Sequence, residues 1–283
     1  MVNTSNIVFC EMLTDIVNKG SSVTTRNSTT KRIPNLMHTF HATPLITVRR
    51  TAWKSALREM EWFLSGSNNV NDLHPSVRKW WEPWINSTCD VDNGEAFVNN
   101  NYSKQFRRFE GHGHGPVKTF HSVDQLQVLK DGIKNHPYSR RNVITTWHTH
   151  DMVSPATDIT NCHGSLIQAL VEPSDNSLHL TMVQRSADMA LGVPHNWIQY
   201  WAFLMYLAHH GGREVGSFCW HGVDCHVYPD HEAMIKRMAN SLHKALKVPE
   251  LVYTPTSEDF IASDFTLNSK YEPVIKESLE MTV

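Results

Sequence analysis

The chain has 283 residues, of which 40% are hydrophobic, and it contains nine tryptophans. This apolar content excludes an intrinsically disordered chain and is sufficient for one large domain or two small ones. The formal net charge of -2 excludes the concentrated basic surface that nucleic-acid-binding proteins usually carry, so we expect no DNA binding.

The N-terminus and the cysteines bear on where the protein is located in the cell. Apolar residues recur at helical spacing over 1–20, but Glu11, Asp15 and Lys19 interrupt them, which excludes a signal peptide and a membrane anchor. The five cysteines are an odd number and lack both the close pairs of zinc sites and the density of a disulfide scaffold. We therefore expect free thiols, a cytoplasmic location and no membrane partner.

The first part of the chain predicts two helices separated by a loop and short β-strands. Apolar periodicity favours helices over 7–19 and 52–64, the second ending at Gly66. The Ser- and Thr-rich stretch 21–31 is predicted to be a loop, and 36–48 has short β-forming runs.

The rest of the chain predicts a turn-rich region and then a β-rich half. Residues 65–125, rich in Asn, His, Gly and Pro, indicate a variable insertion or active-site lid. Further on, the pattern predicts a helix over 125–135, β-strands over 142–147, 165–171, 177–184, 216–220 and 225–228, and a buried helix over 197–210 that stops at Gly211-Gly212. No repeat or linker divides the chain, so we predict a single α+β domain over 1–283.

Two motifs about twenty residues apart indicate chemistry on a nucleotide. Cys162 lies between Asn161 and His163, and the stretch 184–196 contains Arg185 and Asn196. An isolated cysteine is more often a buried structural residue than a nucleophile. Here an arginine can bind a phosphate, an amide can bond the edge of a base, and a thiolate can add to an electron-poor ring carbon. This combination favours the interpretation of Cys162 as a nucleophile.

An extended set of motifs resembles the thymidylate synthase family, which includes the phage pyrimidine hydroxymethylases. The resemblance covers nearly the whole chain and is most specific in the 184–196 block. The residues that carry it are Arg26, Arg49-Arg50, Glu59 in Arg58-Glu59-Met60-Glu61-Trp62-Phe63, Trp81, Trp84, Tyr102, Ser139-Arg140-Arg141, Cys162-His163, Asp224-Cys225-His226-Val227-Tyr228 and the ending Met281-Thr282-Val283. It implies an α+β thymidylate synthase-like fold with a large twisted mixed sheet, flanked by helices, one face of which forms a homodimer interface.

The resemblance implies a covalent mechanism on dUMP with methylenetetrahydrofolate as co-substrate. Cys162 would add to C6 of the pyrimidine, so that C5 attacks the one-carbon unit of the folate. Arg26, Arg185 and Ser186 would hold the 5′-phosphate, with Arg140 and Arg141 contributed by the second subunit.

The remaining roles that the resemblance implies concern the base, the sugar and the folate. Asn196, with Gln184, would read O4 and N3–H of uracil, whereas cytosine-specific relatives carry an aspartate there. His226 and Tyr228 would bind the deoxyribose, Glu59 would move protons near O4, and Tyr102 would assist loss of the C5 proton. The folate contacts would be Asp188, Trp80, Trp81, Gly192, Arg49 and Val283.

Several of these residues have structural interpretations when taken alone. Glu59 fits a solvated helix face, Arg140-Arg141 a surface pair, and the tryptophans a core. The eighteen histidines invite a metal site, but none has the carboxylate or cysteine spacing of catalytic zinc, so we expect no metal.

Three departures from the family bear on the product. Asn161, Ser103 and His195 stand where thymidylate synthases usually have proline, glycine and phenylalanine. Polar groups there favour an ordered water and therefore 5-hydroxymethyl-dUMP over dTMP. Reductive methylation to dTMP is the alternative hypothesis, and a non-catalytic nucleotide-binding or RNA-binding homologue is a third.

Overall fold

The computed structural model describes residues 3–25, 28–88, 91–92, 95–98, 101–112, 120–153, 161–245 and 247–279. Its centre is a six-stranded mixed sheet in the order β1-β2-β10-β9-β8-β7. The strands span Ser21–Thr24 (β1), Thr29–Phe40 (β2), Val143–Ile144 (β7), Leu166–Glu172 (β8), Ser177–Asp188 (β9) and Glu214–Val227 (β10). The predicted α+β class with a large mixed sheet is confirmed.

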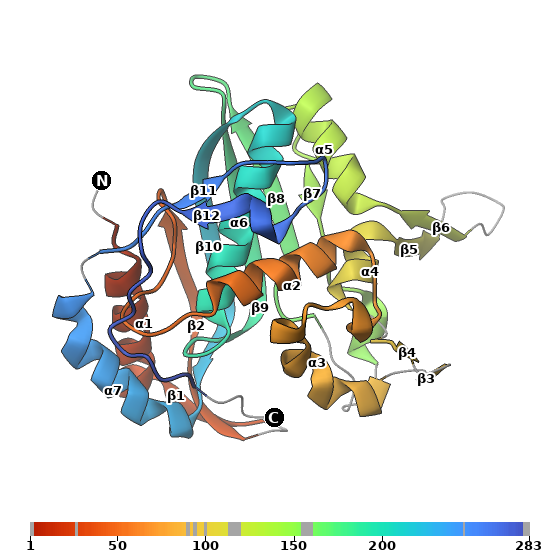
Figure 1. The fold of residues 1–283 in the computed structure, drawn as a ribbon. Helices are drawn as coiled ribbons and strands as arrows, with labels where there is room; N and C mark the ends of the chain where they lie inside the picture. The colour runs from red at the N-terminus through yellow and green to blue at the C-terminus, as the bar shows by residue number, and fades with distance from the viewer. Residues whose placement is uncertain are drawn as a thin grey trace.

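Helices cover one face of this sheet (Figure 1). They span Ser5–Lys19 (α1), Trp53–Ser65 (α2), Pro75–Thr88 (α3), Tyr102–Arg107 (α4), Gln125–Asn135 (α5), Val193–Gly211 (α6) and Glu232–Ser241 (α7). Short 3-10 turns occupy Val70–Asp72, Thr149–Met152, Pro229–His231, Leu242–Lys244 and Ala262–Asp264. Three two-stranded sheets complete the described fold: Val91–Asp92 (β3) with Glu95–Ala96 (β4), Phe109–His112 (β5) with Phe120–Val123 (β6), and Leu251–Tyr253 (β11) with Phe265–Leu267 (β12).

Helix α6 forms the centre of the core. Its Trp197 is fully buried and packs against Phe40 of β2 and Trp220 of β10, with ring centroids 4.7 and 5.5 Å apart. Burying a large apolar side chain of this kind contributes about 1.5–3 kcal/mol. The helix ends at Gly212 in the left-handed region (φ 65°), as the glycine pair predicts.

The order of the strands collects several strand ends at one edge of the sheet. β9 and β10 pair in parallel, because α6 provides the crossover that parallel neighbours require. The register places Ser186 beside Asp224 and Asp188 beside His226. β8 is antiparallel to β9, so the loop that precedes Leu166 lies at the same edge. This edge is where the sequence places its candidate site residues.

The outer face of the sheet is partly apolar. Met37 is 64% exposed, Leu170 is 44% exposed, and Leu166 and Val223 are also exposed. Along β8, exposed and buried side chains alternate, with Ile167 among the buried ones. Helices α1, α5 and α6 lie against the opposite face (Figure 1). None of the helices in the described ranges is both long and apolar enough to cross a membrane.

Some predicted elements differ from the structure. The stretch 21–31, predicted to be a loop, forms β1 and the start of β2, because Ser and Thr residues suit an edge hairpin as well as a turn. β10 is one strand with a bulge near its start rather than two strands, and β7 is shorter than the predicted 142–147. Helices α3, α4 and α7 were not predicted.

Candidate active site

Cys162 lies on the loop before β8 and is partly exposed. Its backbone N–H donates a 2.7 Å hydrogen bond to the hydroxyl of Tyr102, at the start of α4. The ring of Tyr102 stacks on His163 at 4.2 Å, and Nδ1 of His163 lies 2.9 Å from the hydroxyl of Tyr200. These contacts fix the position of the sulfur relative to the Tyr102 hydroxyl.

Gly164 allows this loop to turn beneath the helix. Its φ is +71°, and a Cβ there would come within 2.6 Å of the Tyr200 hydroxyl. Only glycine fits both the backbone conformation and the space. The Asn161-Cys162-His163-Gly164 segment is therefore held by sterics as well as by hydrogen bonds.

Arg185 of β9 approaches the nucleophile from the next strand. Its Nε donates to the carbonyl of Asn161 at 2.9 Å, and a terminal guanidinium nitrogen lies 4.0 Å from the Cys162 sulfur. The guanidinium also stacks over the ring of Trp147, 4.7 Å from its centroid. A cation at this distance stabilises a thiolate, and a guanidinium is also a residue type that binds anions.

The other predicted phosphate ligands lie in three places. Ser186 follows Arg185 and its backbone N–H approaches the carbonyl of Cys162 at 3.4 Å. Arg140 and Arg141 are exposed on the turn before β7, and the Arg140 carbonyl accepts a bond from Gln168 in β8. Arg26 lies outside the described residues. Within the described chain, the structure therefore brings Arg185 and Ser186 to the nucleophile.

A chain of amide hydrogen bonds fixes Asn196. Nε1 of Trp220 donates to Oε1 of Gln184 at 2.9 Å, and Nε2 of Gln184 donates to Oδ1 of Asn196 at 3.0 Å. Nδ2 of Asn196 donates in turn to Oε1 of Gln199 at 3.1 Å. Each Asn196 amide atom keeps one further hydrogen-bonding position for a ligand.

Glu59 of α2 is half-buried at the far end of this chain of hydrogen bonds. Its carboxylate accepts bonds of 2.7 Å from Nε1 of Trp81 and from Nε2 of Gln199. Burial raises the pKa of Glu59 to about 7, and the two hydrogen bonds oppose part of that rise. An acid with this pKa can both donate and accept a proton near neutral pH.

Asp188, His226 and Tyr228 line the strand ends. Oδ1 of Asp188 accepts from the backbone of Ala190 and Leu191 at 3.2 and 3.1 Å, which shapes the turn into α6. Gly192 is the N-cap of that helix. His226 is paired with Asp188 in the sheet, and the Tyr228 ring lies edge-on to it at 5.5 Å.

The predicted folate residues fall into two groups. Trp81 is buried with its ring 5.0 Å from Trp62, and Trp80 is half-buried with its ring 5.3 Å from His195. Arg49 is fully buried and donates to the carbonyls of Arg50 and Ala190, beneath the Asp188 turn. Burial lowers its pKa to about 10. Val283 lies outside the described residues.

All three polar departures are bonded internally. Nδ1 of His195 contacts the Leu191 carbonyl at 2.9 Å, and Nε2 accepts from the Ala52 N–H at 3.2 Å. Burial lowers the pKa of His195 to about 4, so it is neutral. The Ser103 hydroxyl donates to the Trp62 carbonyl at 2.7 Å. Asn161 is also buried, and its amide donates to the Thr146 carbonyl at 2.9 Å.

The sequence reasoning missed Gln199 and Tyr200. Both are fully buried in the apolar helix α6, yet their polar atoms contact Glu59 and His163. A glutamine inside an otherwise apolar buried stretch is a signal that could have found the first, because a buried amide requires partners.

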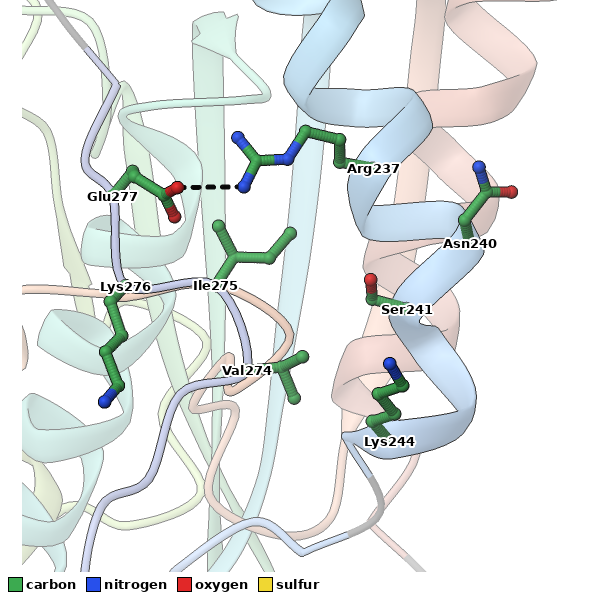
Figure 2. Close-up of a pocket in the computed structure, with 8 residues that line it drawn as sticks. All are labelled: Arg237, Asn240, Ser241, Lys244, Val274, Ile275, Lys276 and Glu277. Carbon is green, nitrogen blue, oxygen red and sulfur yellow. Dashed lines mark hydrogen bonds and ion pairs between the residues drawn. The ribbon is translucent and has the colours of Figure 1, made fainter.

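The described residues contain no group of three or more His, Cys, Asp or Glu side chains that could hold a metal ion. A separate pocket of about 550 Å³ lies between α7 and the segment 274–277. Figure 2 shows the Arg237–Glu277 ion pair, 2.9 Å long, between two of the residues that line it. Backbone bonds from Val274 and Ile275 to Thr47 and Val48 hold that segment, so the pocket marks where the C-terminal tail is anchored.

The comparisons with known proteins agree with this arrangement. Residues 8–283 match the family model described as thymidylate synthase. The chain is 34% identical over 220 residues to a protein of Corynebacterium aurimucosum named thymidylate synthase, covering 75% of this chain and 74% of the relative. It is 30% identical over 251 residues to a thymidylate synthase of Francisella philomiragia, covering 84% and 85%. The chain belongs to the thymidylate synthase family, and it is a one-carbon transferase of that type.

Proposed function

We propose that this enzyme transfers the one-carbon unit of methylenetetrahydrofolate to C5 of dUMP through a covalent adduct of Cys162 with C6. The observation that carries the proposal is the position of the Cys162 sulfur, which lies beside Arg185 and on a loop bonded to the Tyr102 hydroxyl. A cation next to a partly exposed thiol favours the nucleophilic thiolate.

The chain's own groups fit the successive steps. The thiolate adds to C6, and the electron pair of the C5–C6 bond moves towards O4, where a proton from Glu59 can be taken up. C5 then bonds to the one-carbon unit that the folate supplies, and the two bonds of that carbon to folate nitrogens break in turn as C5 loses its proton towards water near Tyr102, which leaves a methylene group on C5. After hydride or water adds to this methylene, the thiolate leaves C6 and the enzyme is regenerated. Glu59 suits its part because burial raises its pKa to about 7.

Two products can follow from the same intermediate on dUMP. Hydride from the folate gives dTMP and dihydrofolate, whereas water gives 5-hydroxymethyl-dUMP and tetrahydrofolate. Reductive methylation is supported by the names of the relatives and by the internal bonding of His195 and Ser103, which leaves these groups occupied by main chain. We therefore place dTMP first, which reverses the order that the polar residues suggest in the sequence alone.

Hydroxymethylation is the second candidate, and the proton chemistry of Glu59 carries it. Asn161 puts a buried amide directly before the nucleophile, where the family usually has proline, but its nitrogen is bonded to the Thr146 carbonyl as His195 and Ser103 are bonded to main chain. Glu59 could also remove a proton from a water in the site, because its pKa is raised to about 7 by burial.

One incubation tests the reaction and separates the products. The enzyme is mixed with dUMP and methylenetetrahydrofolate, the nucleotide is analysed by mass spectrometry, and the folate is followed by absorbance. An added methyl group with dihydrofolate supports reductive methylation, and an added hydroxymethyl group with tetrahydrofolate supports the second candidate. Unchanged dUMP would contradict the proposed function and favour a binding homologue.

We also propose that the enzyme acts as a homodimer that pairs through the outer face of the sheet. Exposed Met37, Leu166 and Leu170 on that face support the interface, because exposed apolar patches commonly mark contacts with a second copy. Arg140 and Arg141 would then reach the phosphate of the partner's site. Both arginines are exposed, and the Arg140 carbonyl accepts a bond from Gln168 of β8. The turn that carries the two arginines therefore lies beside this face.

A further inference from the structure

Gln199 connects the two groups that the proposed reaction requires at O4 of the base. Its Oε1 accepts from Nδ2 of Asn196 at 3.1 Å. Its Nε2 donates to the Glu59 carboxylate at 2.7 Å and to the carbonyl of Ala56 at 3.0 Å. Gln199 is fully buried, so water does not provide alternative partners for these atoms.

The direction of these hydrogen bonds is set by two neighbouring groups, one of which can only donate and the other only accept. The indole of Trp220 can only donate, so the atom of Gln184 that it contacts is the oxygen. The carbonyl of Ala56 can only accept, so the atom of Gln199 beside it is the nitrogen. Asn196 lies between the two glutamines, and its amide has a single orientation that satisfies both.

Amide orientation determines which pyrimidine edge can be read. Uracil presents an N3–H donor and an O4 acceptor, whereas cytosine presents an N3 acceptor and an N4 donor. One orientation of Asn196 matches the first edge, and the reverse orientation matches the second. Reversing Asn196 would set nitrogen against nitrogen at Gln184 and oxygen against oxygen at Gln199, and buried mismatches of this kind are costly.

We propose that Gln199 is a positioning and specificity-determining residue, which orients Asn196 for a uracil edge and holds the carboxylate of Glu59 in place. This inference rests on the proposed function for the identity of the substrate. It adds that the Gln199 side chain, together with Gln184, sets the discrimination between uracil and cytosine through Asn196, and that Gln199 also couples base recognition to proton transfer.

Two substitutions separate the two roles of Gln199. Gln199→Met keeps the volume and removes all three hydrogen bonds, so the Glu59 carboxylate loses one donor and Asn196 keeps its orientation only through Gln184. Gln199→Glu keeps an acceptor for Asn196 and replaces the donor to Glu59 with a second carboxyl group. Its preference for dUMP over dCMP should therefore persist, while the titration of Glu59 should move to higher pH.

The matched control is Gln125→Met. Gln125 is another partly buried amide, and its Nε2 donates to the carbonyls of Gln105 and Thr145, both at 2.8 Å. It lies at the start of α5, and none of its bonds involves a residue that we place in the site. This variant should lower thermal stability as Gln199→Met does, and it should leave nucleotide preference and Glu59 titration unchanged.

Calorimetry of dUMP and dCMP binding measures the nucleotide preference. NMR titration of protein labelled with 13C-glutamate measures the Glu59 pKa, and the Glu59 signal is assigned by its absence from Glu59→Gln. For Gln199→Met we expect the dUMP preference to fall roughly ten-fold or more and the Glu59 pKa to rise by about one unit. If both stay at the wild-type values, Gln199 is merely structural and the inference is overturned.

The failure of this inference differs from the failure of the proposed function. Wild-type protein that binds neither nucleotide would contradict the proposed function. In that case the titration of Glu59 still decides whether Gln199 positions the carboxylate, because it requires no ligand. A wild type that prefers dCMP would overturn the inferred orientation of Asn196.

Discussion

The backbone N–H of Cys162 donates a 2.7 Å hydrogen bond to the hydroxyl of Tyr102, which lies sixty positions earlier in the chain. The hydroxyl also approaches the N–H of His163 at 3.4 Å. Two main-chain donors therefore direct its own proton away from the loop, and burial raises the pKa of Tyr102, which keeps the hydroxyl protonated. The hydroxyl is therefore held at a fixed position relative to the loop that carries the nucleophile.

Substitution of the nucleophile tests the covalent step. Cys162→Ala should lower product formation at least ~10³-fold, because the addition to C6 has no substitute nucleophile, while dUMP binding persists. Mass spectrometry with 5-fluoro-dUMP and methylenetetrahydrofolate should show a covalent adduct in the wild type alone. Cys219→Ala is the control, because Cys219 lies within β10 and should retain full activity. An adduct in Cys162→Ala would contradict this assignment.

Removing the Tyr102 hydroxyl tests its part in the reaction. Tyr102→Phe keeps the stacking on His163 and loses only the oxygen. We expect kcat to fall by roughly 10²–10⁴-fold with little change in dUMP affinity, since proton transfer is affected and binding is not. The control is Tyr138→Phe, which removes an exposed hydroxyl and should have no effect on kcat. Phe106→Tyr, one turn further along α4, would be a poor control because Phe106 is fully buried.

The raised pKa of Glu59 predicts a pH dependence of stability. Burial raises the pKa from 4.5 to about 7, so between these values the folded protein binds a proton that the unfolded chain has released. Protonation of Glu59 therefore contributes to the free energy of unfolding at low pH, and this contribution, on the order of 3 kcal/mol, is lost as the pH rises towards 7.

Comparing the wild type with Glu59→Gln isolates this contribution. The difference in free energy of unfolding between the two proteins, from urea titrations at pH 5 and pH 7.5, should shift in favour of the variant as pH rises. His163 and His195 titrate with the opposite sign, because burial lowers their pKa values to about 3 and 4, but they are common to both proteins. A difference that does not vary with pH would contradict the assignment.

Two glycines with positive φ separate backbone strain from steric clash. Gly164 has φ 71° and little space, whereas Gly212 has φ 65° and no atom within 4 Å of a built Cβ. Gly212→Ala should cost about 1 kcal/mol, and Gly164→Ala about 2–4 kcal/mol, because it also displaces the Tyr200 hydroxyl. Thermal unfolding measures both, and equal losses would show that the clash relaxes.

Subunit mixing tests the proposed sharing of arginines. Arg140→Ala and Cys162→Ala should each be nearly inactive as homodimers. After exchange, a mixed dimer contains one site with both Cys162 and the partner's arginine, so activity should recover to roughly a quarter of the wild-type value by random pairing. Lack of recovery, with dimers confirmed by light scattering, would place Arg140 in its own subunit's site or outside both sites.

The sequence predicted the elements with strong apolar periodicity and the residues with distinctive chemistry. α2 and α6 ended at the glycines expected, Arg185 lies beside Cys162 at one sheet edge, and Asn196 is bonded to Gln184, the neighbour of Arg185 in β9. Periodicity did not reveal the β1–β2 hairpin, since its polar residues suit turns and edge strands equally. The sequence also did not show which partners the polar side chains would find. His195 was expected to bind a water, but its two ring nitrogens are bonded to the backbone of Leu191 and Ala52.

The parallel pairing of β9 with β10 has a consequence for folding. It forms only after α6 has crossed over the sheet, and Glu59 joins Gln199 only once α2 has packed on α6. Contacts between such distant segments form slowly, because loop-closure entropy must be overcome before they add stability. The nucleotide site is therefore a property of the completely folded chain, and a bound nucleotide should slow global unfolding as well as occupy the site.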